Sequence, residues 1–371
     1  MATSSVVSNG LDGIVVAETS ISEVDGEAGR LTIKGHDAEE LAQHAEFEQT
    51  CHLLWSNEMP DANELANIRA QFGEGRVAAH QLISKNMFAL ERQNPMDALR
   101  TCTSLLDGDT QSRTADYIPI SAAIPVFVAH WYRHKNGLPI IAPQNGNTHA
   151  ADFLNMLGLE HVTQAQVAGL NAYLTTVSDH GMNASTFTCR VVASTASDNV
   201  SCVVAAIGAL KGPLHGGAPG PVLEMLAEIG APENAETWLN KELDSHKRIM
   251  GMGHRVYRVR DPRAAVFENA IARLEKAGLP APRLALARYV EKTAERLLAE
   301  RHPDRPLKAN VEFYTAVLLD TIGIAQELFT PTFAIGRVAG WCAHIAEQRA
   351  SGRLIRPASV YIGPHLNDQL N

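Results

Sequence analysis

The chain has 371 residues, of which 45% are apolar and 20% are charged. This composition is typical of a folded globular protein and excludes disordered, collagen-like and disulfide-stapled classes, while the length favours about two to three domains. Its 32 basic and 41 acidic residues give a net charge of −9, so neither nucleic acid nor an anionic membrane is expected as a partner.

The cysteines and the N-terminus indicate a cellular compartment. The five cysteines are widely spaced and include no C-x-x-C pair, so we expect buried, reduced thiols rather than disulfides or a zinc ribbon. No stretch reaches the ~18 uninterrupted apolar residues of a membrane span. A signal or transit peptide would require basic residues near the N-terminus, and no lysine or arginine precedes Arg30. We therefore expect a cytoplasmic protein.

The first predicted element is a β-hairpin within residues 13–34, where apolar and polar residues alternate around an Asp25-Gly26 turn signal. From about Asp37 onward, the apolar residues follow helical spacing. The apolar runs at 120–131 and 202–210 are expected to be buried core helices. We predict an all-α protein in which the small N-terminal hairpin is the main sheet.

Clusters of glycine and proline divide the chain. The clusters at 212–221 and 303–309 are the strongest internal boundaries. They predict a large helical domain, formed by residues 1–220 together with 331–371, and a smaller domain at 221–330. Because clefts between domains are favoured ligand sites, we expect the small domain to close over the functional site.

Several familiar signatures are absent from the sequence. There is no G-x-S-x-G, no G-x-x-x-x-G-K-[ST] and no H-E-x-x-H, so serine hydrolases, P-loop enzymes and zincins lose their main support. The segment Gly251-Met252-Gly253 lacks the third glycine and the preceding strand of a dinucleotide-binding fold.

The basic residues of this acidic chain gather in residues 246–263. The stretch GMGHRVYRVRDPR, from Gly251 to Arg263, places glycines and His254 beside several guanidinium groups, which suit a carboxylate or a phosphate. A solvated basic helix end is the structural alternative. The mixture of glycine, histidine and arginine favours an anion site.

Two further motifs carry titratable side chains. His215 lies in the glycine-rich turn GPLHGG, where it either faces a ligand or caps a helix C-terminus. Glu312 lies among apolar neighbours in ANVEFY, directly after Asn310 and Val311. It either complements the dipole of a helix that Asn310 caps, or is buried with a raised pKa and acts as a base.

Three weaker candidates complete the set. His180 lies in the polar segment DHGMNAST, which is equally typical of a loop with local Asx hydrogen bonds. Arg337 and Arg356 are single arginines on apolar or turn segments, and a structural ion pair would explain each equally well.

Taken in order, these segments resemble the citrate synthase family, specifically its short bacterial and archaeal type. The resemblance rests on GPLHGG, GMGHRVYRVRDPR, NVEFY, Gly336-Arg337 and RLIRPASVYIG, and it spans nearly the whole chain. It implies an all-α homodimer with the two-domain citrate synthase fold, whose domains close over oxaloacetate and acetyl-CoA.

The resemblance also implies roles for particular residues. His215 matches the histidine that binds the thioester carbonyl, His254 matches the one that polarises the oxaloacetate ketone, and Glu312 stands where the base stands. The oxaloacetate-binding residues would be His180, Arg263, Arg337 and, supplied across the dimer, Arg356. Coenzyme A would contact Arg258, Ile249, Met250, Gly251, Gly253 and Asn310. No metal and no tightly bound cofactor is expected, because acetyl-CoA is a co-substrate.

The leading functional hypothesis is therefore an acyltransferase of the tricarboxylic acid cycle that makes citrate from acetyl-CoA and oxaloacetate. A 2-methylcitrate synthase that uses propionyl-CoA is the nearest alternative, since one extra methyl group is worth only ~1–3 kcal/mol in an apolar pocket. The family usually has Asp where this chain has Glu312, whose side chain is longer by ~1.5 Å. A weakly active or regulatory paralogue is the third possibility.

Overall fold

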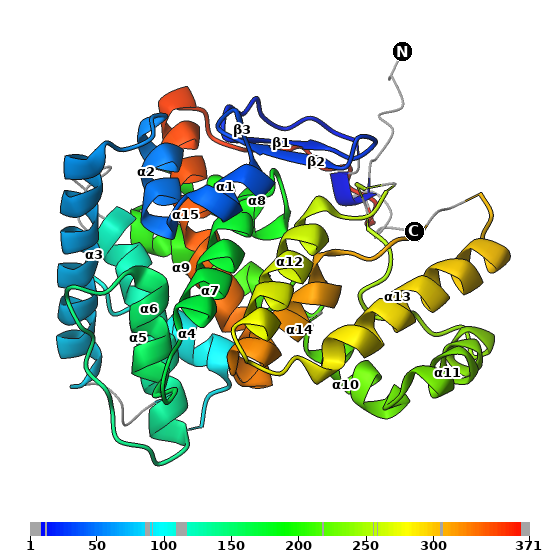
Figure 1. Cartoon of the computed structure of the whole chain (residues 1–371). Coiled ribbons are helices and arrows are strands. Elements are labelled where there is room, and N and C mark those ends of the chain that lie inside the picture. The colour runs from blue at the N-terminus through cyan, green and yellow to red at the C-terminus, as the bar shows by residue number, and fades with distance from the viewer. Residues whose placement is uncertain are drawn as a thin grey trace.

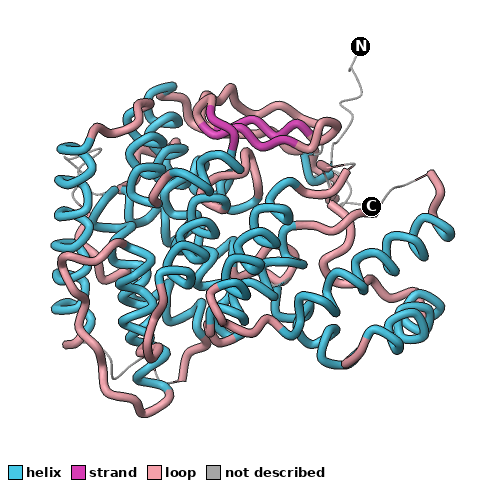
Figure 2. The backbone as a smooth tube through the Cα atoms, in the orientation of Figure 1, coloured by secondary structure: helices cyan, strands magenta, loops and turns pink. Residues whose placement is uncertain are grey.

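The structure is a computed structural model that describes residues 9–11, 13–85, 90, 92–108, 117–216, 219–254, 256–257, 259–304 and 307–364. Within these ranges the chain forms fifteen α-helices and one small sheet (Figure 1). Figure 2 shows that helices make up most of the molecule and that the strands lie together at one edge. The predicted all-α fold class is confirmed.

The predicted N-terminal hairpin is present, and a short third strand extends it. Strands β1 (Ser22–Asp25), β2 (Arg30–Ile33) and β3 (His36–Asp37) form an antiparallel sheet in that order. The Asp25 carboxylate accepts hydrogen bonds from the backbone N–H groups of residues 27 and 28, which closes the turn between β1 and β2. The third strand was not expected, because two residues carry no alternation signal.

Ten helices form the body at the left and centre of Figure 1. Both consecutive and more distant helices pack together, with α8 against α9 and α3 against α5. Their bounds are α1 (Ala38–His44), α2 (Phe47–Ser56), α3 (Ala62–Ile83), α4 (Pro95–Thr103), α5 (Tyr117–Lys135), α6 (His149–Leu157), α7 (Gln164–Thr176), α8 (Ala184–Ala193), α9 (Asn199–Leu210) and α15 (Phe329–Ser351). The apolar runs expected to be core helices are α5 and α9, as predicted.

Helix α15 is the centre of this body. It packs against α2, α5, α8 and α9, and its residues from Val338 to Ile345 are all buried. A helix that is apolar on every side is stable only when other helices surround it. The last long helix of the chain therefore organises helices that precede it by more than 100 residues.

Five helices cover the predicted small domain: α10 (Pro219–Ile229), α11 (Pro232–Asp244), α12 (Pro262–Lys276), α13 (Pro282–Arg301) and α14 (Val311–Ile322). In Figure 1, α11 and α13 lie at the right, whereas α12 and α14 lie between them and α7. Helix α12 packs on both α7 and α14. The domain boundaries at 220 and 331 stay a prediction.

The cysteines and the apolar helices can be compared with the expectations from the sequence. All five cysteines are buried, and none forms a disulfide. Among the helices that the structure describes, none combines the length and the apolar character needed to cross a bilayer.

A buried ion pair fastens α6 to α3. Arg76 Nε lies 2.6 Å from Asp152 Oδ2, and neither side chain is exposed. Arg76 Nη2 also donates to the Asn147 carbonyl at 2.7 Å, while Asp152 Oδ1 accepts from the Gln144 N–H at 2.9 Å. The pair therefore also holds the loop that enters α6.

Replacing Asp152 by Asn is expected to lower the free energy of unfolding by ~3–5 kcal/mol, because Arg76 then remains buried without its counter-charge. Chemical denaturation followed by circular dichroism measures this change. The control is Glu300→Gln, which removes one partner of the exposed Arg296–Glu300 pair and should have no measurable effect. Equal stability of the Asp152→Asn and control variants would contradict the assignment.

Candidate active site

Two helix N-termini and a glycine-containing segment form the frame of the site. Helix α12 begins after its N-cap Asp261, and α14 begins after its N-cap Asn310. The Asp261 N–H donates to the Ala309 carbonyl at 3.2 Å, and the Asn310 N–H donates to the Gly251 carbonyl at 2.9 Å. Arg263 and Glu312, each the second residue of its helix, are thereby brought together where helix dipoles favour an anion.

The two predicted glycines of this frame are structurally required. Gly251 and Gly253 have φ angles of 74° and 86°, which favour glycine. A methyl group on Gly251 would lie 2.8 Å from the Phe313 ring, and one on Gly253 would lie 2.9 Å from the Leu307 side chain. Both residues bring their backbone close to neighbouring elements, so a larger residue would displace the segment that ends in His254.

His254 is held by the backbone that follows it. Its Nδ1 accepts hydrogen bonds from the N–H groups of Val256 at 3.0 Å and Tyr257 at 3.1 Å. A peptide N–H can only donate, so Nδ1 is unprotonated and Nε2 carries the proton. Burial, reinforced by nearby Arg263, lowers the pKa of His254 to about 4. His254 is therefore a neutral donor through Nε2.

His215 has the opposite tautomer. Its Nε2 lies 2.8 Å from the Ser185 hydroxyl and accepts from the Ser185 N–H at 3.3 Å, near the start of α8. Trp341 Nε1 donates to the same hydroxyl at 3.1 Å and holds Ser185 in place. Nδ1 of His215 therefore carries the proton. Burial, with a further contribution from Arg337, lowers the pKa of His215 to about 4.

His180 lies beside His254 rather than apart from it. The two rings are 5.6 Å apart in an edge-to-face arrangement, and His180 Nε2 lies 3.2 Å from the Tyr257 hydroxyl. The Tyr257 ring is 4.8 Å from the His254 ring. Burial and the nearby Arg263 and Arg337 hold the pKa of His180 well below its usual range. Three aromatic side chains thus form one neutral wall.

Two buried guanidinium groups supply the positive charge. Arg263 donates from Nε and Nη2 to both oxygens of Asp261, at 3.0 and 2.7 Å. Arg337 donates from Nε to the Val177 carbonyl at 2.6 Å and lies over the Phe333 ring. Within the described residues, Nη1 of Arg263 and both Nη atoms of Arg337 have no hydrogen-bond partner. These atoms are suited to bind carboxylates.

Glu312 is the acidic group of the site. Asn310 Oδ1 accepts from its backbone N–H at 3.1 Å, which confirms the predicted N-cap. Among the described residues, no other residue forms a hydrogen bond or an ion pair with its carboxylate, which interacts with its own backbone N–H. Burial raises the pKa of Glu312, although the positive charges of Arg263 and Arg337 oppose this shift. An unpaired carboxylate with a raised pKa is suited to accept a proton.

The predicted residues divide into three groups. His180, His215, His254, Arg263, Glu312 and Arg337 are linked by the contacts and electrostatic interactions given above. Arg356 lies exposed on the extended segment after α15, and no described contact joins it to them. Arg258 lies outside the described residues. Ile249, Met250, Gly251, Gly253 and Asn310 form the frame, and their role toward coenzyme A stays a prediction.

Sequence reasoning missed the residues that orient the histidines. The sequence motifs predicted no role for Ser185, Tyr257, Asp261 or Trp341. Ser185 lies in the motif DHGMNAST and Tyr257 in the motif GMGHRVYRVRDPR, so their positions in the sequence could have indicated that they lie near the site. Their contacts join residues 30 and 77 positions apart, which spacing alone does not reveal.

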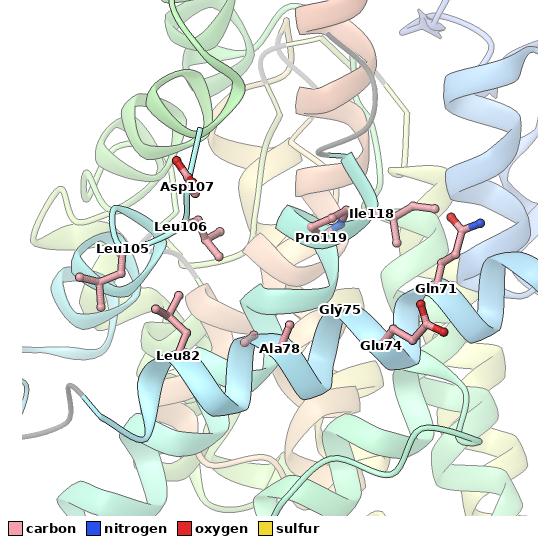
Figure 3. Close-up of a pocket in the computed structure, with 11 residues that line it drawn as sticks. Gln71, Glu74, Gly75, Ala78, Leu82, Leu105, Leu106, Asp107, Ile118 and Pro119 are labelled. Carbon is pink, nitrogen blue, oxygen red and sulfur yellow. The ribbon is translucent and has the colours of Figure 1, made fainter. Parts of the chain in front are cut away.

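A separate pocket lies away from these residues. This pocket of about 530 Å³ lies between α3, the start of α5 and residues 105–107 (Figure 3), and none of the predicted site residues lines it. Among the described residues, no group of three or more His, Cys, Asp or Glu side chains is arranged to hold a metal ion.

Oriented neutral imidazoles, an unpaired carboxylate and two buried guanidiniums define an enzyme site for acid–base chemistry on an anionic substrate. Residues 10–358 match the family described as "Citrate synthase, C-terminal domain". The chain belongs to the citrate synthase family, as its motifs had indicated.

Relatives support this membership along the whole chain. Citrate synthase 2 of Bacillus subtilis is 38% identical over 96% of this chain and 95% of its own, and a 2-methylcitrate synthase of Mycobacterium tuberculosis is 37% identical over 96% and 91%. The crystal structure of citrate synthase from Pyrobaculum aerophilum has a TM-score of 0.86 at 34% identity, covering 96% of this chain and 92% of that one.

The pH dependence of this site should show a single ionisation on its acid side. The pKa of Glu312 is raised above 4.5, so the basic form is lost, and kcat/KM falls, as the pH drops through that raised value. His215 and His254, with pKa values of about 4, remain neutral over the same range. A pH–rate profile between about pH 5 and 8 measures this. Two acid-side ionisations would show that a histidine titrates.

Proposed function

We propose that this chain is a citrate synthase that joins acetyl-CoA to oxaloacetate and hydrolyses citryl-CoA to citrate and CoA, an acyl transfer. The proposal rests above all on the Glu312 carboxylate, which is partly buried and interacts with Arg263 and Arg337, the same two guanidiniums that act on His254 and His215. A related structure, from Thermoplasma acidophilum, is described as a ternary complex with carboxymethyl coenzyme A and oxaloacetate, and it has a TM-score of 0.86 at 26% identity.

The first step is removal of a methyl proton from acetyl-CoA. Glu312 takes this proton, and the negative charge that develops on the thioester oxygen receives a hydrogen bond from Nδ1–H of His215. Because the donor is already oriented by Ser185, little reorganisation is needed as charge develops. Exclusion of water by the closed site strengthens the interaction.

The second step forms the carbon–carbon bond. The methylene carbon attacks the ketone carbon of oxaloacetate, and the ketone oxygen becomes an alkoxide that accepts from Nε2–H of His254. The alkoxide takes up one proton from solvent through His254, while Glu312 releases to solvent the proton that it removed. Arg263 and Arg337 bind the two carboxylates, with His180 beside them. Water then cleaves the thioester of citryl-CoA, so that the C–S bond breaks and CoA leaves as the thiol.

The proposal assigns acetyl-CoA as the co-substrate and uses no metal or tightly bound cofactor. The backbone from Ile249 to Gly253, with Asn310 and Arg258, is the proposed contact surface for CoA. A cytoplasmic location is part of the same proposal. The relatives named 2-methylcitrate synthase support the alternative with propionyl-CoA, which differs only in the acyl group.

The function is tested by thiol release with oxaloacetate and a panel of acyl-CoA thioesters. Acetyl-CoA is expected to give the highest kcat/KM, and Glu312→Gln is expected to lower kcat by about 10²–10⁴-fold, because the base is lost. Glu312→Asp keeps the carboxylate and should remain at least about tenfold more active than Glu312→Gln, despite the changed reach.

Three results would overturn parts of this assignment. A clear preference for propionyl-CoA would identify a 2-methylcitrate synthase. Binding of oxaloacetate without any thiol release would indicate a regulatory paralogue. An unchanged rate in Glu312→Gln would remove Glu312 from the mechanism.

The proposal includes a homodimer in which the partner subunit's Arg356 completes each site. In the single chain, Arg356 lies on an extended segment that also exposes apolar side chains, among them Leu354, Val360 and Ile362 at 58%, 56% and 94%. Exposed apolar side chains of this kind favour burial against another surface. A second copy of the chain would both cover them and receive the guanidinium.

Complementation between two inactive variants tests this arrangement. Arg356→Ala and Glu312→Gln are co-expressed with different affinity tags, and the heterodimer is isolated. If the partner supplies Arg356, one of its two sites is intact and about half of the wild-type activity is recovered. An inactive heterodimer would show that Arg356 acts within its own chain, and a two-tag Arg356→Ala homodimer provides the baseline.

A further inference from the structure

We propose that the N-terminal hairpin, strands β1 and β2 with their turn at 26–29, is a positioning element of the oxaloacetate pocket. It holds the two loops that carry His180 and His254. The inference rests on the proposed function in one respect, because that function assigns the pocket to oxaloacetate. The contacts of the hairpin itself do not depend on that assignment, and they involve both of its ends.

The first contact fixes the loop of His180 from both sides. The Ser22 hydroxyl donates to Asp179 Oδ2 at 2.5 Å and accepts from the Gly181 N–H at 2.9 Å. One side chain of β1 therefore binds the residue before His180 and the residue after it. Asp179 is buried and also lies 3.2 Å from His344 Nε2 of α15, so the loop is tied to the core helix as well.

The second contact fixes the loop of His254. The turn between β1 and β2 packs against this loop so closely that a methyl group on Gly26 would lie 2.4 Å from the Val256 carbonyl oxygen. A methyl group on Gly29 would lie 2.5 Å from the Val259 side chain. Val256 also donates its N–H to His254 Nδ1, so the turn supports the peptide segment that sets the tautomer.

The hairpin also borders Arg263 across a small cavity. A cavity of about 20 Å³ is bounded on one side by the start of β2, including Arg30 and Leu31, and on the other by Pro262 and Arg263 of α12. This space is large enough for roughly one water molecule. The hairpin therefore lies directly next to the helix start that presents this guanidinium.

The hairpin is itself anchored to the body of the protein. The Ser20 N–H, just before β1, donates to Glu347 of α15 at 2.8 Å, and Glu347 pairs with Arg190 of α8 at 2.6 Å. The hairpin is thus a fixed element that borders the segments of His180, His254 and Arg263. Such an element reduces the entropy lost when a ligand orders these segments. Loosening either end should therefore weaken oxaloacetate binding or misplace His254.

Ser22→Ala tests the first end. The expected result is a dissociation constant for oxaloacetate that rises about tenfold, the size typical of losing a hydrogen bond to a charged group, while the KM for acetyl-CoA stays unchanged. Ser22→Thr keeps the hydroxyl and should restore binding. The matched control is Thr32→Ala on β2, whose hydroxyl has no hydrogen bond among the described residues.

Gly26→Ala tests the second end, because its methyl group must push the Val256 backbone away. The expected result is a fall in kcat of about tenfold at saturating substrates, since His254 is displaced from the ketone oxygen. The control is Gly146→Ala, where a methyl group meets no atom within 4 Å and the backbone is not left-handed.

Calorimetric titration of the full-length protein with oxaloacetate, together with steady-state kinetics and the melting temperature, gives the readouts. If wild type fails to bind oxaloacetate, the proposed function is wrong. If wild type binds and turns over, but Ser22→Ala and Gly26→Ala match their controls within about twofold, only the hairpin inference is overturned. A lower melting temperature with unchanged binding and kcat would likewise overturn it, since the hairpin would then be structural alone.

Discussion

The site depends on backbone N–H groups that donate to one nitrogen of each of two imidazoles, His254 and His215. The N–H groups of Val256 and Tyr257 bind His254 Nδ1, and the N–H of Ser185 binds His215 Nε2. A backbone donor cannot reverse its role, so protonating either ring would break these bonds and add charge to a buried site. Both histidines are therefore neutral at physiological pH, and each carries one N–H whose direction is set by the fold.

This constraint explains why the surrounding backbone is so specific. Gly251 and Gly253 adopt left-handed conformations so that their segment can run beside residues 308–310. The pairing of residues 251–253 with residues 308–310 brings His254, Arg263 and Glu312 close together, although they belong to a loop and two different helices. Asn310 serves both sides, since it caps α14 and also donates to the Gly253 carbonyl at 2.9 Å. Loss of this junction would affect a donor, an anion ligand and the base together.

The sequence predicted the parts of this site better than their connections. Local signals identified the hairpin, the buried helices α5 and α9, and the Asn310 N-cap, because each depends on residues close together in the chain. The motifs around His215, His254 and Glu312 likewise carry their own signatures of glycine, arginine and acidic residues. The tautomers and the Ser22–Asp179 bond could not be predicted, because they join segments up to 157 residues apart. The domain boundaries depend on how the helices pack together, and the subunit that supplies Arg356 to each site depends on assembly of the chains. Local sequence patterns encode neither.

The charges of the site bear on the basicity of Glu312. Arg263 and Arg337 lower the pKa of Glu312 and so oppose the effect of burial. A dicarboxylate bound to these guanidiniums would neutralise them and add negative charge nearby, and both changes raise the pKa of a carboxylate. Glu312 then becomes a stronger base after oxaloacetate binds than before. In the proposed mechanism, the arginines that bind oxaloacetate would therefore also lower the basicity of Glu312 until that substrate is bound.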